Sequence, residues 1–352
     1  MRNGRTLVQL AEELERQRTT KKDLVLHSSM MRHETGEGGD TRLIVDHVEG
    51  GQFAVTELAR RQLAGKLNIP YAYFERMRVE QPGLLDSNVN TWLQTDDSRR
   101  MLRTLDGQAR AVLSDRYRRL DNYDLASAVI PILKTLTDLR FESVELTATR
   151  MYLKAVVPVL AYTMTPGDVV QAGIVITNSE VGHGTLSVQP LLYRLVCSNG
   201  LILPDRALRK THIGRALGSE DNQVQVYQDD TLRADDRAFF LKVRDVVQAT
   251  VTETAFQEAA RKMQRTMGIP LTGDPVRSVE VLADRYDLSE GEQTGVLRHL
   301  IQGGDLSGYG LVNAVTHFSQ EVEDYDRATD FEEIGGKLVE LTSKEWDGLL
   351  TA

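Results

Sequence analysis

"DVVQAGIVITNSEVGHGTLSVQPLLYRLVCSNG", residues 168–200, decides the fold of this chain. Two runs rich in apolar and β-branched residues flank a turn from Asn178 to Gly184. Gly182 and Gly184 give that turn its backbone freedom. We therefore predict a long β-hairpin. The preceding stretch "FESVELTATRMYLKAVVPVL", residues 141–160, alternates as a strand should. The centre of the chain is thus expected to form an antiparallel sheet.

Helical periodicity lies on both sides of this sheet. Residues 6–18 place leucines at helical spacing, and "NYDLASAVIPILKTLTDL", residues 122–139, predicts a helix that Pro131 could bend. From Leu232 onward the pattern is helical, with an apolar stripe that includes Phe239 and Val243. We predict an α+β fold, with a central antiparallel sheet and its long hairpin flanked by helices, and a helical C-terminal half.

The N-terminal part predicts strands and helices of its own. "KDLVLHSSMMRHE" (residues 22–34) and "TRLIVDHVEGGQFAV" (residues 41–55) indicate strands, and a helical block follows from Thr56 to about Arg78, broken at "NIPYAY". Residues 82–97 are expected to be irregular, because they contain Pro82, Gly83 and several asparagines. The predicted division is an N-terminal α+β region (1–120), a central sheet domain (121–230) and a helical C-terminal region with an acidic end (231–352).

Composition limits the class of protein. The 352 residues carry a net charge of −9, and Cys197 is the one cysteine, so an intramolecular disulfide and a multi-cysteine zinc site are excluded. There is no apolar run near the length of a membrane span and no secretory signal. We expect a cytoplasmic protein with no membrane partner.

The charge is unevenly distributed. Residues 319–352 hold ten acidic residues against three basic ones, which makes −7, whereas residues 99–119 hold seven arginines against two aspartates, which makes +5. Such asymmetry is compatible with nucleic-acid binding by an acidic chain. The acidic C-terminal segment could restrain non-specific binding or contact a protein partner.

The stretch "RRQLAGKLNIPYAYFERMR", residues 60–78, has the apolar skeleton of a helix-turn-helix with basic flanks. A DNA-binding protein of that type places its second helix in the major groove. Many helical hairpins share the skeleton without touching DNA. A duplex-binding regulator built on this segment would depend on Tyr71 and Arg76.

Three further basic segments are candidate nucleic-acid contacts. Single strands are typically held by cations and aromatic stacking platforms, and a strand places alternate residues on one face. Local pairing with acidic residues, or an ordinary solvated strand face, remains the alternative explanation. The candidates are Arg116, Tyr117, Arg118 and Arg119; then Arg150, Tyr152 and Lys154 on the predicted strand; and Arg209, Lys210 and Arg215 after the hairpin.

No catalytic motif stands out. The chain has no serine-nucleophile elbow, phosphate-binding glycine loop or dinucleotide fingerprint. His183, Cys197, Asp205 and His212 lack a known metal-ligand spacing. We predict no catalytic residue, metal or cofactor and do not expect an enzyme, although a metal-dependent nuclease stays a minor option.

Six blocks of the sequence resemble one known family. They are "TELARRQLAGKLNIPYAYFERM", "NVNTWL", "RTLDGQARAVLSDRYRRLDNYDL", "YRLVCSNGLIL", "THIG" and "GYGLVNAVTHFSQEVEDYDRATDFEEIGGKL". Together these blocks, from about residue 50 to 340, resemble domain-of-unknown-function family 932. The resemblance implies a phage, prophage or plasmid setting in a prokaryotic host cell. The hairpin and its adjacent helix are also loosely similar to the core of strand-annealing recombinases.

The leading hypothesis is therefore a mobile-element protein that binds or anneals single-stranded DNA without ATP, as a homo-oligomer. The first alternative is the helix-turn-helix duplex regulator. The second is a non-enzymatic interaction protein, such as a counter-defence factor, which would have no affinity for nucleic acid.

Overall fold

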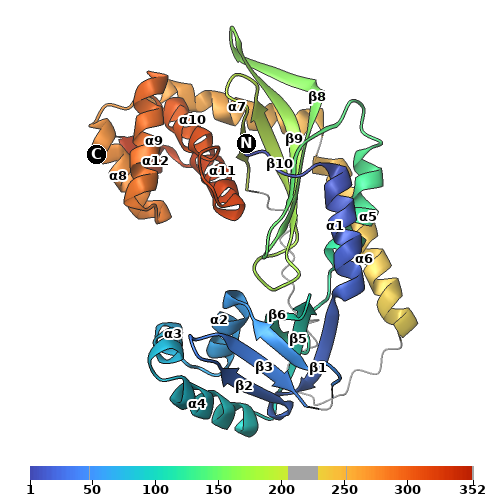
Figure 1. Cartoon of the computed structure of the whole chain (residues 1–352). Helices are drawn as coiled ribbons and strands as arrows, with labels where there is room; N and C mark the ends of the chain where they lie inside the picture. The colour runs from blue at the N-terminus through green and yellow to red at the C-terminus, as the bar shows by residue number, and fades with distance from the viewer. Residues whose placement is uncertain (47, 205–228, 251, 351–352) are drawn as a thin grey trace.

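The computed structural model describes residues 1–46, 48–204, 229–250 and 252–350, with only the backbone described for 229–237. It confirms the predicted α+β class. Within the described residues, twelve α-helices accompany two sheets, and the C-terminal part is helical (Figure 1).

The first sheet forms an N-terminal lobe, residues 22–114. Neighbouring strands are antiparallel except for β4 and β6, which are parallel. The sheet order is β1 (Lys22–His27), β5 (Arg99–Leu105), β6 (Gln108–Ser114), β4 (Gln52–Val55), β3 (Thr41–Val45) and β2 (Met31–Thr35), with a short 3-10 helix, η1 (Ser28–Met30), between β1 and β2. The hairpin of β5 and β6 was not among the predicted strands.

Three helices pack on one face of this sheet around a core of their own: α2 (Glu57–Lys66), α3 (Tyr71–Glu80) and α4 (Pro82–Thr95). The expectation that residues 82–97 are irregular is wrong. Pro82 occupies the first turn of α4, where its missing N–H costs no helical hydrogen bond. Leu85, Val89 and Leu93 follow at intervals of four and are buried.

The second sheet contains the predicted long hairpin. It is fully antiparallel, in the order β11 (Asn199–Ile202), β10 (Ser187–Arg194), β9 (Asp168–Asn178), β8 (Met151–Thr165) and β7 (Arg140–Leu146). β9 and β10 pair from Val170 opposite Arg194 to Thr177 opposite Ser187. Helices α1 (Leu7–Thr20), α5 (Asn122–Leu133) and α6 (Asp229–Thr250) cover one face of this sheet.

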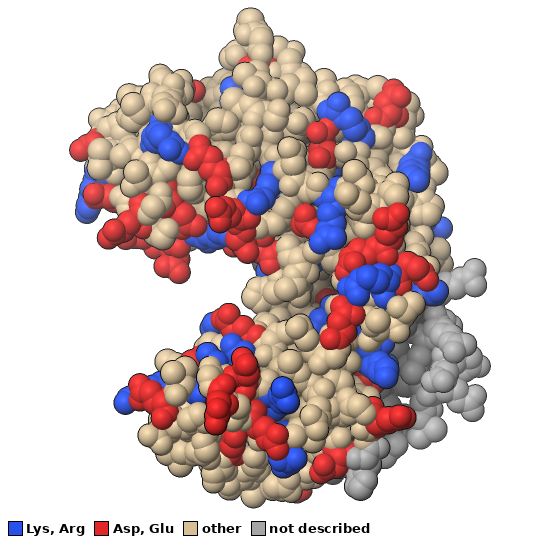
Figure 2. Space-filling view, in the orientation of Figure 1, with Lys and Arg blue, Asp and Glu red and all other residues tan. Residues whose placement is uncertain are grey.

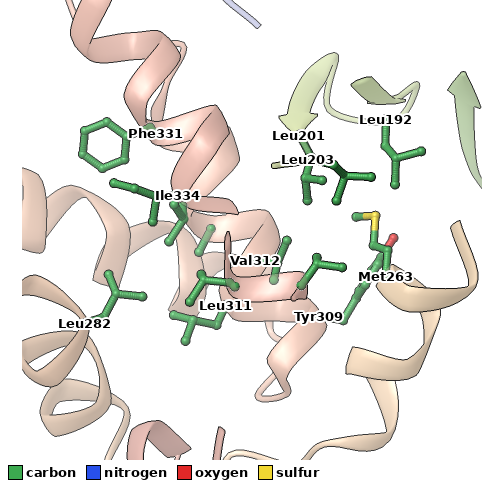
Figure 3. Packing of buried hydrophobic residues seen from close by; sticks show 14 of the residues in the cluster. Leu192, Leu201, Leu203, Met263, Leu282, Tyr309, Leu311, Val312, Phe331 and Ile334 are labelled. Atoms are coloured by element: carbon green, nitrogen blue, oxygen red, sulfur yellow. The ribbon is translucent and has the colours of Figure 1, made fainter. Parts of the chain in front are cut away.

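Helix α11 (Tyr325–Val339) covers the opposite face, where Lys154 of β8 bonds Glu332. The first face continues over Leu192, Leu201 and Leu203, which lie near Met263 and Tyr309 in the largest apolar cluster (Figure 3). Both faces of the sheet are therefore buried over its central part. The C-terminal bundle comprises α7 (Glu253–Arg265), the 3-10 turn η2 (Thr266–Gly268), α8 (Pro275–Tyr286), α9 (Glu290–Gly303), α10 (Gly308–Phe318), α11 (Tyr325–Val339) and α12 (Ser343–Leu350).

A buried ionic junction joins the N-terminal lobe to the second sheet. Arg103 on β5 is fully buried and bonds Asp23 at 2.8 Å and Asp121 at 2.6 Å. A third donor of Arg103 reaches the backbone oxygen of Glu180 in the hairpin turn. The Glu180 carboxylate in turn accepts from Lys21, Arg110 and the Asn122 backbone N–H. Burial disfavours the Arg103 charge, but the surrounding carboxylates outweigh it and raise the pKa of the guanidinium.

Removing one partner from such a network leaves uncompensated buried charge. We expect Arg103→Met to lower the free energy of unfolding by about 3–5 kcal/mol in a urea titration. Arg116→Met is the matched control, because Arg116 is exposed and lies outside this junction, and it should change stability by less than about 0.5 kcal/mol. Equal effects of the two substitutions would contradict a structural role for the junction.

A histidine pair links α9 and α10 inside the C-terminal bundle. Nδ1 of His299 lies 3.0 Å from Nδ1 of His317, and Nε2 of His299 lies 2.8 Å from Glu321. One proton serves the contact between the two Nδ1 atoms, so a second proton would break it. Burial, the neighbouring His299 and the N-terminal ammonium lower the pKa of His317, with a smaller contribution from Arg194, and Glu321 opposes them only in part.

This lowered pKa predicts a stability that depends on pH. The unfolded chain takes up a proton on His317 more readily than the folded chain, so stability falls as pH drops below about 6.5. His317→Gln should weaken that fall, measured as the urea midpoint at a series of pH values. His27→Gln, at an exposed histidine on β1, should keep the wild-type pH dependence. An unchanged pH slope in His317→Gln would refute this account.

Candidate nucleic-acid interface

A groove of about 490 Å³ opens in the N-terminal lobe between the α2–α3 turn and the C-terminal end of α4. The turn exists because Asn68 takes a left-handed conformation, with φ of 56°, directly after α2. The Ile69 N–H then bonds back to the Ala64 carbonyl. This turn places Lys66, Asn68 and Tyr73 along one side of the groove, and α4 supplies Asn88 and Trp92.

Two exposed aromatic rings line the groove. Trp92 is 53% exposed and Tyr73 is 43% exposed. The chain has two tryptophans, and the other, Trp346, is buried in the C-terminal bundle. A large ring left open to solvent beside a concave surface is available to stack on a planar ligand.

The groove also contains a cation without an acceptor. Lys66 is half-buried, and no residue in the described part of the chain accepts a hydrogen bond from it or pairs with its charge. Its pKa lies below the ordinary 10.5, because burial disfavours the ammonium and because Arg100 repels it, while Asp96 opposes that shift only in part. An anion placed here would relieve both effects.

The carboxylate of Asp96, beside Lys66, already accepts hydrogen bonds from other residues. Asp96 accepts hydrogen bonds from Ser28, from Ser98 and, at 2.9 Å, from Arg100. Burial would raise the pKa of Asp96, but these donors outweigh it and lower the pKa. Lys66 and Arg100 against this one carboxylate make the groove net positive, so it can take an anionic group next to a stacked ring.

The structure uses most of the predicted cluster 116–119 internally. The hydroxyl of Tyr117 donates to the Ser179 carbonyl, Arg118 lies 4.6 Å from the centre of the Phe239 ring, and Arg119 lies 3.8 Å from Asp23. Arg116 is exposed. These residues lie beside the ionic junction, and their contact with nucleic acid stays a prediction.

The expectation that Arg150, Tyr152 and Lys154 form an exposed row is wrong. They do share one face of β8, as alternation requires, but α11 covers that face. Lys154 and Tyr152 are fully buried, and Lys154 bonds Glu332 at 2.7 Å and Thr329 at 2.9 Å. Arg150 bonds the His183 carbonyl and the hydroxyl of Tyr152. Alternation identifies a shared face and does not show whether another element packs on it.

Two other predicted segments have different outcomes. Arg209, Lys210 and Arg215 lie outside the described residues. The helix-turn-helix segment 60–78 does form two helices, α2 and α3, joined by a turn. Its arginines are paired: Arg60 and Arg78 with Glu75, and Arg76 with Glu80.

The family model for a domain of unknown function, DUF932, matches residues 109–336, well over half of the chain. The chain belongs to the DUF932 family. No curated protein and no solved structure matches it significantly. The matched part of this DUF932 protein begins on β6, so the residues that line the groove all precede it.

The acidic C-terminal segment of this DUF932 protein is part of its packed interior. Phe331, Ile334 and Leu338 of α11 belong to the largest apolar cluster. Some of the acidic side chains in the segment have partners within the bundle: Glu321 pairs with Arg298, and Glu345 pairs with Arg285. Deletion of 319–352 would therefore remove part of the core and could not isolate an effect on binding.

Charges of both signs are interspersed on the face shown in Figure 2, and no continuous basic stripe crosses it. Among the described residues, no group of histidine, cysteine and carboxylate side chains is arranged to hold a metal ion. None of the helices in the described ranges combines the length and apolar character needed to cross a bilayer.

Proposed function

We propose that this DUF932 protein binds single-stranded nucleic acid, with a base stacked on Trp92 or Tyr73 and a backbone phosphate at Lys66. The observation that carries the proposal is the half-buried Lys66, which lacks an acceptor in the described part of the chain, in a groove bordered by two exposed rings. Stacking and a cation on the backbone are the two elements that single-strand binding proteins combine.

A stacking ring and a cation for the backbone together favour a single strand over a duplex. A base in a duplex is covered by its stacked neighbours, so only an unpaired or splayed base can present its face to Trp92. The duplex alternative requires free cations on α3, but Arg76 and Arg78 are already paired with carboxylates of the same helix. The groove therefore supports the single-strand proposal better than the helix-turn-helix one.

The finer form of the proposal is annealing of complementary strands without ATP, by an oligomer encoded on a mobile element. It rests on the sequence resemblance to annealing proteins. A groove that leaves one edge of a stacked strand open would suit this role.

We expect Trp92→Ala to weaken binding of a labelled single-stranded oligonucleotide by about 1–3 kcal/mol, because one stacking platform is lost. Lys66→Gln should lower the slope of log affinity against log salt by about 0.7. Each phosphate contact releases counterions on binding, and the variant has lost one such contact. Fluorescence anisotropy across a salt series measures both effects.

The matched control is Arg76→Gln on α3, an exposed cation of the same lobe that lies outside the groove. It should leave affinity and salt slope unchanged. Because Trp346 is buried, quenching of tryptophan fluorescence by an unlabelled strand should be lost in Trp92→Phe. Binding that depends on Arg76 and prefers duplex would transfer the function to α3, and absence of binding at low salt would overturn the proposal.

A further inference from the structure

Two asparagine carboxamides line the groove beside the exposed rings. Asn88 lies one helical turn before Trp92 on the same side of α4, and Asn68 lies at the α2–α3 turn across the groove. Neither side chain has a hydrogen-bond partner among the residues that the structure describes. A carboxamide offers two donors and an acceptor, and its planar fork matches the edge of a base.

A neighbouring asparagine shows the contrast. Asn90 on α4 accepts from the His33 backbone N–H at 2.7 Å and donates to the His33 carbonyl at 2.9 Å, so its amide holds α4 on β2. Asn88 lies on the groove side and makes no such bond. A polar side chain without a partner in the described residues, next to a stacking ring, is positioned to hydrogen-bond the edge of a base that stacks on the ring.

We propose that Asn88, with Asn68 opposite, selects adenine for the groove. This inference rests on the proposed function. Adenine presents a donor at N6 beside an acceptor at N7, and the asparagine side chain pairs with both at once. A base stacked on Trp92 would bring that edge toward Asn88, because residues four apart on a helix are neighbours.

The alternative base for a cationic groove is guanine, whose two acceptors suit lysine or arginine. The structure argues against that choice, because Arg100 is engaged with Asp96 and Lys66 is the one cation of the groove left for the phosphate. Cytosine and thymine do not present the N6/N7 pattern of a purine.

The test compares thymine-rich single strands that carry a short block of adenines, cytosines or guanines, by anisotropy with the full chain. The wild type should bind the adenine strand at least about fivefold more tightly than the others. Asn88→Ala should remove this preference while retaining Trp92-dependent binding. Asn88→Asp, which accepts but no longer donates, should shift the preference toward cytosine.

Asn88→Gln is the conservative rescue, since glutamine pairs with adenine in the same way. Its binding should keep the adenine preference. Asn90→Ala is expected to disturb the contact of α4 with β2 and so to alter binding through stability alone. Thermal unfolding of every variant is therefore measured alongside binding. Equal binding of all strands, or a guanine preference, overturns the inference while leaving the proposed function intact, and loss of Trp92 dependence overturns both.

Discussion

The position of the N-terminal lobe against the second sheet depends on the carboxylate of Glu180. This buried group lies in the turn of the long hairpin, yet its donors come from the end of α1, from β6 and from the start of α5. Arg103 completes the junction by binding the Glu180 carbonyl and two further carboxylates. Because ionic hydrogen bonds are directional, this contact fixes the orientation of the N-terminal lobe on the second sheet more strictly than an apolar contact would.

The same junction explains why the arginine-rich segment is a poor guide to a binding surface. The cations of a folded chain are either used to neutralise buried carboxylates or left for solvent and ligands, and local sequence does not distinguish the two. Arg103 and Arg110 neutralise carboxylates that are distant in the sequence. Lys66, in a stretch with fewer charges, has no hydrogen-bond acceptor among the described residues, and only the three-dimensional arrangement shows this difference.

Patterns of apolar residues predicted the parts of the fold that depend on local order. The hairpin of 168–200, the helices of the C-terminal half and the two helices of 60–78 follow from periodicity and turn residues. Tyr152 and Lys154 were misplaced because burial of a strand face is decided by α11, which lies some 170 residues later. Residues 82–97 were misjudged because proline and asparagine outweighed the spacing of Leu85, Val89 and Leu93. The groove was missed entirely, although Trp92 in a chain with two tryptophans was its available signal.

The strand order of the first sheet sets how this protein can be divided. β6 starts at the edge of the DUF932 match, but in the sheet it lies between β5 and β4, both of which precede the match. A fragment that begins at residue 109 would keep β6 and lose both of its neighbours. The unpaired backbone N–H and C=O groups of β6 would then pair with strands of other chains. We therefore expect such a fragment to aggregate and not to fold as an isolated domain. The start of the segment that matches the family model is therefore not a boundary at which this chain can be cut.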